Sequence, residues 1–145
     1  MSAPDLPKDL RSAIRDLCAP QDFPYTEDAC YFVLEVVARA VADPGRTRLS
    51  HIRGQELCTI AARLAVEDYG PFASMILAKW GIRETMDLGR LVFALADGKV
   101  LGLSEQDSLR DFDGVLDFQQ ALANPFRADP PFPDLPAIRL VPSDI

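Results

Sequence analysis

One histidine and one cysteine are spaced so that a nucleophile and its base have to be considered. His51 is the only histidine of the chain, and Cys58 follows it seven residues later. On a helix this spacing is two turns, about 10 Å of rise, whereas a Cys–His pair needs hydrogen-bond contact. An enzyme centred on His51 is therefore kept only as a second alternative, and no residue is assigned as catalytic.

Three arginines surround this histidine. Arg46, Arg48 and Arg53 flank His51 in a segment that precedes an expected helix. Arginine side chains and a helix N-terminus can together hold a phosphate or a carboxylate. The sequence thus predicts a site for an anion or an acidic partner at these four residues, and the alternative is a solvated basic loop.

An acidic segment near the C-terminal end contains a fragment typical of calcium loops. Asp111, Asp113 and Asp117 have calcium-loop spacing in part, and Gly114 could supply a sharp turn. The third early ligand and the bidentate glutamate of such a loop are missing. A solvated acidic turn is favoured, so we predict no metal and no cofactor, with these aspartates as a weak candidate for calcium.

The charge of the 145-residue chain is uneven. The net charge is −7, of which residues 1–102 carry −2 and residues 103–145 carry −5. An acidic end repels phosphate backbones and anionic lipids and suits a basic protein or a cation, and the simpler interpretation is that it keeps the protein in solution. We expect another protein as the partner, with no membrane, and the oligomeric state stays open.

The cysteines and the N-terminus indicate a compartment. Cys18, Cys30 and Cys58 are odd in number and lack CxxC spacing, which favours reduced buried thiols over a zinc site. The N-terminus has no apolar stretch of signal-peptide length, and no window has the roughly 18 apolar residues of a membrane span. We expect a cytoplasmic protein.

Apolar periodicity predicts a mostly α fold of five to six helices. Thr26 and Thr85 are the expected N-caps of two of them, Gly98 is the expected residue after a helix end, and the helix at 27–41 is expected to be the most buried. The predicted helices cover residues 8–18, 27–41, 50–69, 71–80 and 85–97, with one or two further turns at 119–123.

A small two-stranded ribbon is expected after these helices, at 99–103 and 115–118. Three helices followed by a ribbon are winged-helix-like, which we predict for the C-terminal half. A winged helix that binds DNA needs basic side chains on its last helix, but Arg90 is the only base there. Residues 1–126 are expected to form one domain, and residues 127–145 a proline-rich extended or disordered tail.

Short motifs across residues 8–127 resemble a family of short proteins known mainly from planctomycetes, verrucomicrobia and related bacteria. The resemblance implies a bacterial source and brings no activity, cofactor or site residue with it. The matching residues are Gly54-Gln55-Glu56-Leu57, Gly70-Pro71, Trp80-Gly81-Ile82-Arg83, Leu88-Gly89, Val92-Phe93, Leu101, Asp107-Ser108, Asp111-Phe112, Asp117-Phe118 and Pro125-Phe126.

The leading hypothesis is a non-catalytic protein-interaction or regulatory module. It depends on the missing catalytic constellation and on the contrast between a basic loop and an acidic C-terminal third. The alternative is nucleic-acid binding through the winged-helix-like part, led by Arg46, Arg48, Arg53 and Arg90.

Overall fold

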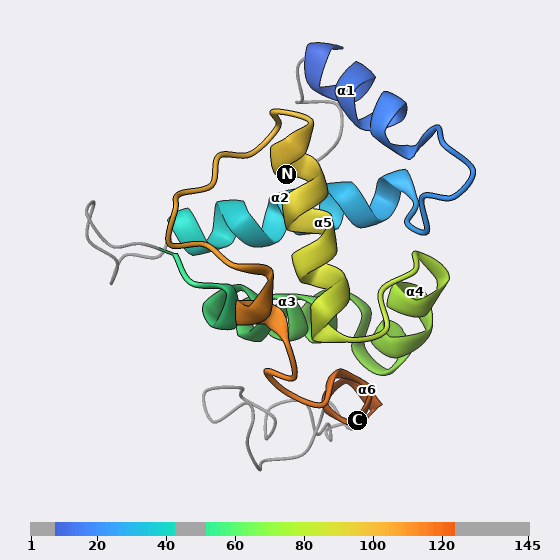
Figure 1. Ribbon diagram of the computed structural model, residues 1–145. Helices are drawn as coiled ribbons and strands as arrows, with labels where there is room; N and C mark the ends of the chain where they lie inside the picture. The colour runs from blue at the N-terminus through green and yellow to red at the C-terminus, as the bar shows by residue number, and fades with distance from the viewer. Residues whose placement is uncertain (1–7, 43–51, 124–145) are drawn as a thin grey trace.

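The fold is mostly helical, as the periodicity predicts. A computed structural model describes residues 8–42 and 52–123 (Figure 1). Its α-helices are α1 (Lys8–Cys18), α2 (Glu27–Val41), α3 (Gly54–Tyr69), α4 (Ala73–Lys79), α5 (Thr85–Asp97) and α6 (Phe118–Ala123), and its short 3-10 helices include η2 (Gly70–Phe72) and η3 (Leu109–Phe112). None of the helices within these ranges has the length and apolar character that a bilayer crossing requires.

Helix α5 organises the described part of the chain. Figure 1 shows it crossing α2 and α3, which also pack on each other, while α1 lies near its C-terminal end. α6 packs against α3 and α4. The buried side chains at the crossings are aliphatic, such as Val33 of α2, Leu64 of α3 and Leu91 of α5. Burial of such side chains supplies the main driving force for this arrangement.

The expectation that the helix at 27–41 is the most buried was wrong. α2 carries an apolar run, but Tyr31, Leu34 and Val37 are only partly buried and Val41 is 62% exposed. α5 is shorter and buries Leu88, Leu91, Val92 and Leu95. The reason is position, because α5 is covered by α1, α2, α3 and η3.

The expected ribbon is absent from the described residues. Residues 99–103 and 115–117 form turns and irregular backbone, and Phe118 already begins α6. The chain turns back after α5 because Lys99 adopts a left-handed conformation (φ 65°). The N–H of Val100 then donates to the carbonyl of Leu95 (2.8 Å), and the N–H of Lys99 to that of Ala96 (2.9 Å). This Schellman motif consumes the backbone groups that a strand would pair. The winged-helix interpretation therefore has no support in this region.

Residues 98–108 form a return strap. Figure 1 shows this segment running back along the side of the molecule from the C-terminal end of α5 to η3. Two aspartates fix its course, because Asp107 accepts from the N–H of Ser104 (2.7 Å) and Asp111 accepts from the N–H of Ser108 (3.3 Å). Such side-chain to backbone bonds replace strand pairing with tight turns.

Candidate functional site

A pocket of about 230 Å³ lies between the return strap and the helices beneath it. Four separate elements contribute to it: α2, the start of α3, α5 and η3. Its walls are mostly aliphatic and aromatic, which is typical of sites that accept an apolar group. The lining residues are Val37, Ile52, Gly54, Leu57, Val92, Phe93, Leu101, Gly102, Leu103, Asp107 and Phe112.

Glycines allow one wall of the pocket to form. The ring of Phe112 is 4% exposed and packs on α3 at Gly54 and on α5 at Gly89. A Cβ at Gly54 would lie 2.9 Å from Phe112 Cε1, and a Cβ at Gly89 would lie 2.7 Å from Phe112 Cγ. Both distances are below van der Waals contact, so these two helices accept the ring only where they carry glycine.

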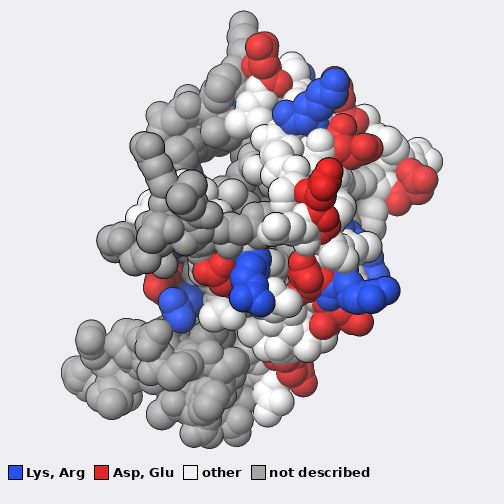
Figure 2. Space-filling model, turned by 60° about the vertical axis from the view of Figure 1, so that its left-hand side comes forward, with Lys and Arg blue, Asp and Glu red and all other residues white. Residues whose placement is uncertain are grey.

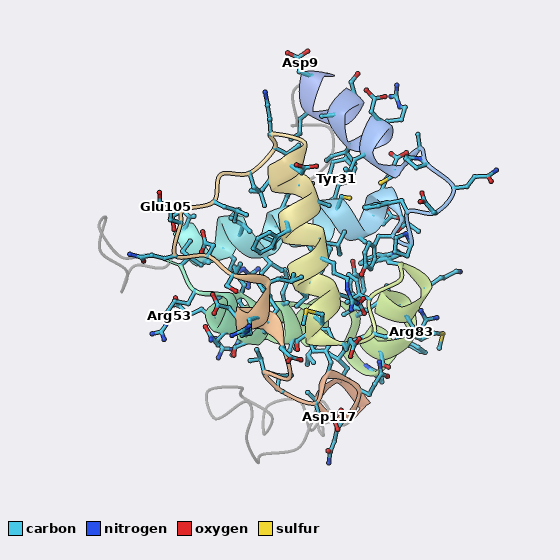
Figure 3. The ribbon with its side chains drawn as sticks, in the orientation of Figure 1. Asp9, Tyr31, Arg53, Arg83, Glu105 and Asp117 are labelled. Carbon is cyan, nitrogen blue, oxygen red and sulfur yellow. The ribbon has the colours of Figure 1, made fainter. Side chains whose placement is uncertain are left out.

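The polar groups near the pocket are of both signs. Asp107 belongs to the lining, and its Oδ2 atom also accepts from the hydroxyl of Ser104 (3.3 Å). Figure 3 shows Arg53 and Glu105 on the same side of the molecule, both projecting away from its body. Figure 2, which brings that side forward, shows acidic and basic side chains intermixed over the part that is described.

A second polar cluster lies in the core, away from the pocket lining. Asp87, which is 7% exposed, accepts hydrogen bonds from the hydroxyl of Tyr25 (2.6 Å), from Nη1 of Arg90 (2.9 Å) and from the N–H groups of Arg83 (2.9 Å) and Glu84 (3.1 Å). Burial alone would raise the pKa of Asp87, but these donors together lower it below its usual value.

The same cluster changes the pKa of the Tyr25 hydroxyl. Burial, together with the hydrogen bond to Asp87, raises the pKa of Tyr25 to about 12. Every oxygen of the Asp87 carboxylate has partners from within the chain, so the cluster joins the α1–α2 connection to the start of α5. Its chemistry is structural, since a carboxylate held ionised by four donors is a poor base.

Three of the four residues of the predicted anion site, Arg46, Arg48 and His51, lie outside the described residues. Arg53 is described and exposed at the N-cap of α3, where its N–H donates to Glu56 Oε1 (3.1 Å). It stands beside the pocket, because its neighbours Ile52 and Gly54 belong to the lining. The anion site therefore remains a prediction, with one of its residues placed.

The three aspartates of the calcium hypothesis do not share a common contact. Asp111 accepts from the N–H of Ser108, and Asp117 Oδ1 accepts from the N–H of Gln120 (3.1 Å) at the start of α6, at the lower edge of Figure 3. Asp113 is exposed and follows η3. Within residues 8–42 and 52–123, no three His, Cys, Asp or Glu side chains are grouped so as to hold a metal ion. The weak calcium hypothesis therefore gains no support from the part of the chain that the structure describes.

Arg90 was the helical base expected to lead a nucleic-acid interface. Its Nη1 atom lies 2.9 Å from Asp87 Oδ1 and 3.8 Å from Glu84 Oε2. The positive charge of Arg90 is thus paired with carboxylates of the same chain, although about half of its side chain is exposed.

Comparison of the chain with protein-family models, with curated proteins and with solved structures gave no match in any of the three.

The sequence interpretation missed the pocket altogether. Its residues come from four helices, the return strap and Ile52, and no short motif joins them. One signal was available: Gly89 lies inside a predicted helix, where glycine costs about 1 kcal/mol relative to alanine, so a packing reason should have been sought.

Proposed function

We propose that this protein is a non-catalytic interaction module that binds a basic segment of another protein through one apolar anchor side chain. The observation that carries the proposal is the apolar pocket beneath the return strap, with Asp107 in its lining. The anchor enters the pocket, and the basic residues beside it face the acidic segment that follows.

The size of the pocket supports a single anchor. A cavity of about 150 Å³ is known to hold benzene, so about 230 Å³ accommodates one aromatic or large aliphatic side chain. Burying such a side chain contributes about 2–3 kcal/mol. That amount gives a weak contact by itself, and the flanking charges have to add affinity and specificity.

The charge of the segment next to the pocket supports a basic partner. Residues 103–117 carry five acids and one base, Arg110. The acids are Glu105, Asp107, Asp111, Asp113 and Asp117. A polyanion such as nucleic acid would be repelled by this segment, whereas lysine and arginine side chains would be attracted.

Two leucines provide a matched test. Leu103 and Leu109 are both 39% exposed, but only Leu103 belongs to the pocket lining. The probes are basic peptides that each carry one tryptophan or leucine, and binding is measured by titration calorimetry. We expect Leu103→Ser to weaken the best peptide by about tenfold, a change of about 1.4 kcal/mol, and Leu109→Ser to leave its affinity unchanged.

NMR locates the binding site independently. On addition of the peptide, the methyl signals of Val37, Val92 and Leu101 should shift, and those of Val33 in the core should not. The proposal fails if no anchored basic peptide binds, or if shifts appear elsewhere. It also fails if free indole binds as tightly as the peptide, because the site would then belong to a small molecule.

We also propose membership of the bacterial family that the motifs resemble. Gly54, Gly89 and Phe112 all belong to the matching motifs, and here they form one packing unit. An alignment of that family with this chain tests the proposal. Members should carry glycine at both helical positions wherever an aromatic residue occupies position 112, and free substitution there would contradict it.

A further inference from the structure

Two of the three cysteines meet in space although they belong to different helices. Cys18 is the last residue of α1, Cys30 lies in the first turns of α2, and their Sγ atoms are 3.7 Å apart. Both are free thiols. A disulfide needs an S–S distance of about 2.05 Å, so the two sulfur atoms have to approach each other by about 1.7 Å to form one.

The two thiols differ in access and in freedom. Cys30 is fully buried within the core, whereas Cys18 is only partly buried at the end of its helix. The side of the connection next to α2 is fixed, because the N–H of Thr26 donates to the carbonyl of Trp80 (3.2 Å) and Tyr25 donates to Asp87 (2.6 Å). Cys18 is therefore the sulfur that a reagent reaches first.

The surroundings of the pair favour a disulfide over a closed metal site. A structural zinc site takes four ligands, but within the described ranges no third Cys, His, Asp or Glu side chain joins these two thiols. Burial raises the pKa of both Cys18 and Cys30. The pair consequently stays protonated near neutral pH and reacts more slowly than an exposed thiol.

We infer that Cys18 and Cys30 are a reversible dithiol pair, which a hydroperoxide oxidises to a disulfide that fastens α1 to α2. Cys18 loses its proton and its sulfur attacks one oxygen of hydrogen peroxide, so that an S–O bond forms and the O–O bond breaks, and the hydroxide that leaves takes up a proton to become water. Cys30 then attacks the Cys18 sulfenic acid, the S–S bond forms, and a second water departs with the thiol proton.

Two electrons pass from the two thiols to one peroxide, and a dithiol reductant reverses the change.

The disulfide would restrain the movement of α1. α1 contacts the rest of the described chain through its apolar face, with Ile14 as its fully buried residue. The covalent link keeps this helix docked and shortens the lifetime of states in which it is detached.

The test uses the full chain, hydrogen peroxide and three single variants: Cys18→Ala, Cys30→Ala and Cys58→Ala. Cys58 is the matched control. It lies in α3 and is fully buried, as Cys30 is, and burial raises its pKa to about 12. Intact mass should fall by two hydrogens in the wild type and in Cys58→Ala, and peptide mapping should recover a Cys18–Cys30 link. The other two variants should not lose this mass.

Trypsin provides a second readout, because Arg15 is exposed on α1. Oxidation should slow cleavage after Arg15 severalfold in the wild type and in Cys58→Ala, and dithiothreitol should restore the original rate. The inference is overturned if peroxide yields only sulfinic acid, links between two chains, or a bridge that includes Cys58. Unchanged trypsin cleavage in the bridged protein would refute the fastening of α1. Circular dichroism confirms that each variant is folded before treatment.

Discussion

The ring of Phe112 occupies the space that a side chain at Gly89 would need. Three ring and Cβ atoms of Phe112 lie within 2.8 Å of where that Cβ would stand. Gly89 is the second residue of the Leu88-Gly89 pair on α5, and Phe112 ends η3. The contact thus sets how closely η3, which follows the return strap, approaches α5.

The first prediction concerns Gly89→Ala. Alanine favours a helix over glycine by about 1 kcal/mol, yet here we expect a net loss of about 1–3 kcal/mol in the free energy of unfolding, because the core is overpacked. Gly98→Ala at the C-cap of the same helix is the control, since its Cβ would make only ordinary contacts, with Ala94 O at 3.6 Å and Leu95 O at 3.8 Å, and it should be neutral or slightly stabilising. Urea denaturation followed by circular dichroism measures both.

A double-mutant cycle identifies the clash as the cause. In a Phe112→Ala background, Gly89→Ala should lose most of its cost, giving a coupling of about 1 kcal/mol or more. Additive effects would contradict the steric explanation and would leave the cost of Gly89→Ala to the helix itself.

The second prediction concerns Tyr25→Phe. Loss of the hydrogen bond to the Asp87 carboxylate should cost about 1.5–3 kcal/mol near neutral pH. The pKa of Tyr25 in the folded chain is about 12, above the usual value of 10.0. The wild type therefore keeps this contribution below pH 10 and loses it as the pH rises toward 12, by up to about 1.4 kcal/mol per pH unit.

The difference in the free energy of unfolding between wild type and Tyr25→Phe should consequently become smaller as the pH rises from 10 toward 12. It should narrow again in acid, because the lowered pKa of Asp87 means that its contribution is lost as the pH falls through that value. Urea unfolding across pH measures the difference, and Tyr31→Phe is the control. A difference that stays constant at every pH would show that the hydroxyl does not face an ionised Asp87.

The third prediction concerns Lys99→Gly. Lys99 is the one described residue other than glycine with a positive φ, and a side chain in this conformation costs about 1–2 kcal/mol. Glycine removes that strain but loses more entropy on folding, so we expect a net gain of about 0.5–1 kcal/mol. Thermal unfolding measures the gain. An equal gain from Lys79→Gly, at the end of α4, would show that the effect is unrelated to φ.

The helices could be predicted from the sequence because the signals that start and end them are local. Thr26 caps α2 as expected, since its Oγ1 accepts from the N–H of Ala29 (3.2 Å), and Gly81 turns the chain after α4 with φ 99°. Two caps were wrong by one residue. The N-cap of α5 is Glu84 instead of Thr85, and the left-handed residue after that helix is Lys99 instead of Gly98. The hydroxyl of Thr85 donates to the carbonyl of Phe112 instead of capping the helix, and the local Schellman bonds fix the position of Lys99.

The candidate site was harder to predict because its parts are distant in sequence. The pocket joins Val37 to Leu103, and the dithiol pair joins residues whose twelve-residue separation has no motif. The apolar types of these residues indicated only that they would be buried. Which of them border an opening depends on the course of the return strap, and that course follows from bonds such as the one between Ser104 and Asp107.

The last prediction concerns Thr85, whose buried hydroxyl joins α5 to the segment after the return strap. Its Oγ1 donates to the carbonyl of Phe112 (2.7 Å) and accepts from the N–H of Val115 (3.4 Å). Thr85→Val keeps the shape but leaves two backbone groups without this partner, so we expect a loss of about 1–3 kcal/mol. Thr85→Ser keeps the hydroxyl and should lose only the methyl contribution, about 1 kcal/mol. Urea unfolding gives both values, and amide exchange should accelerate at Val115 in the valine variant alone. If serine and valine cost the same, the hydroxyl does not hold the two segments together.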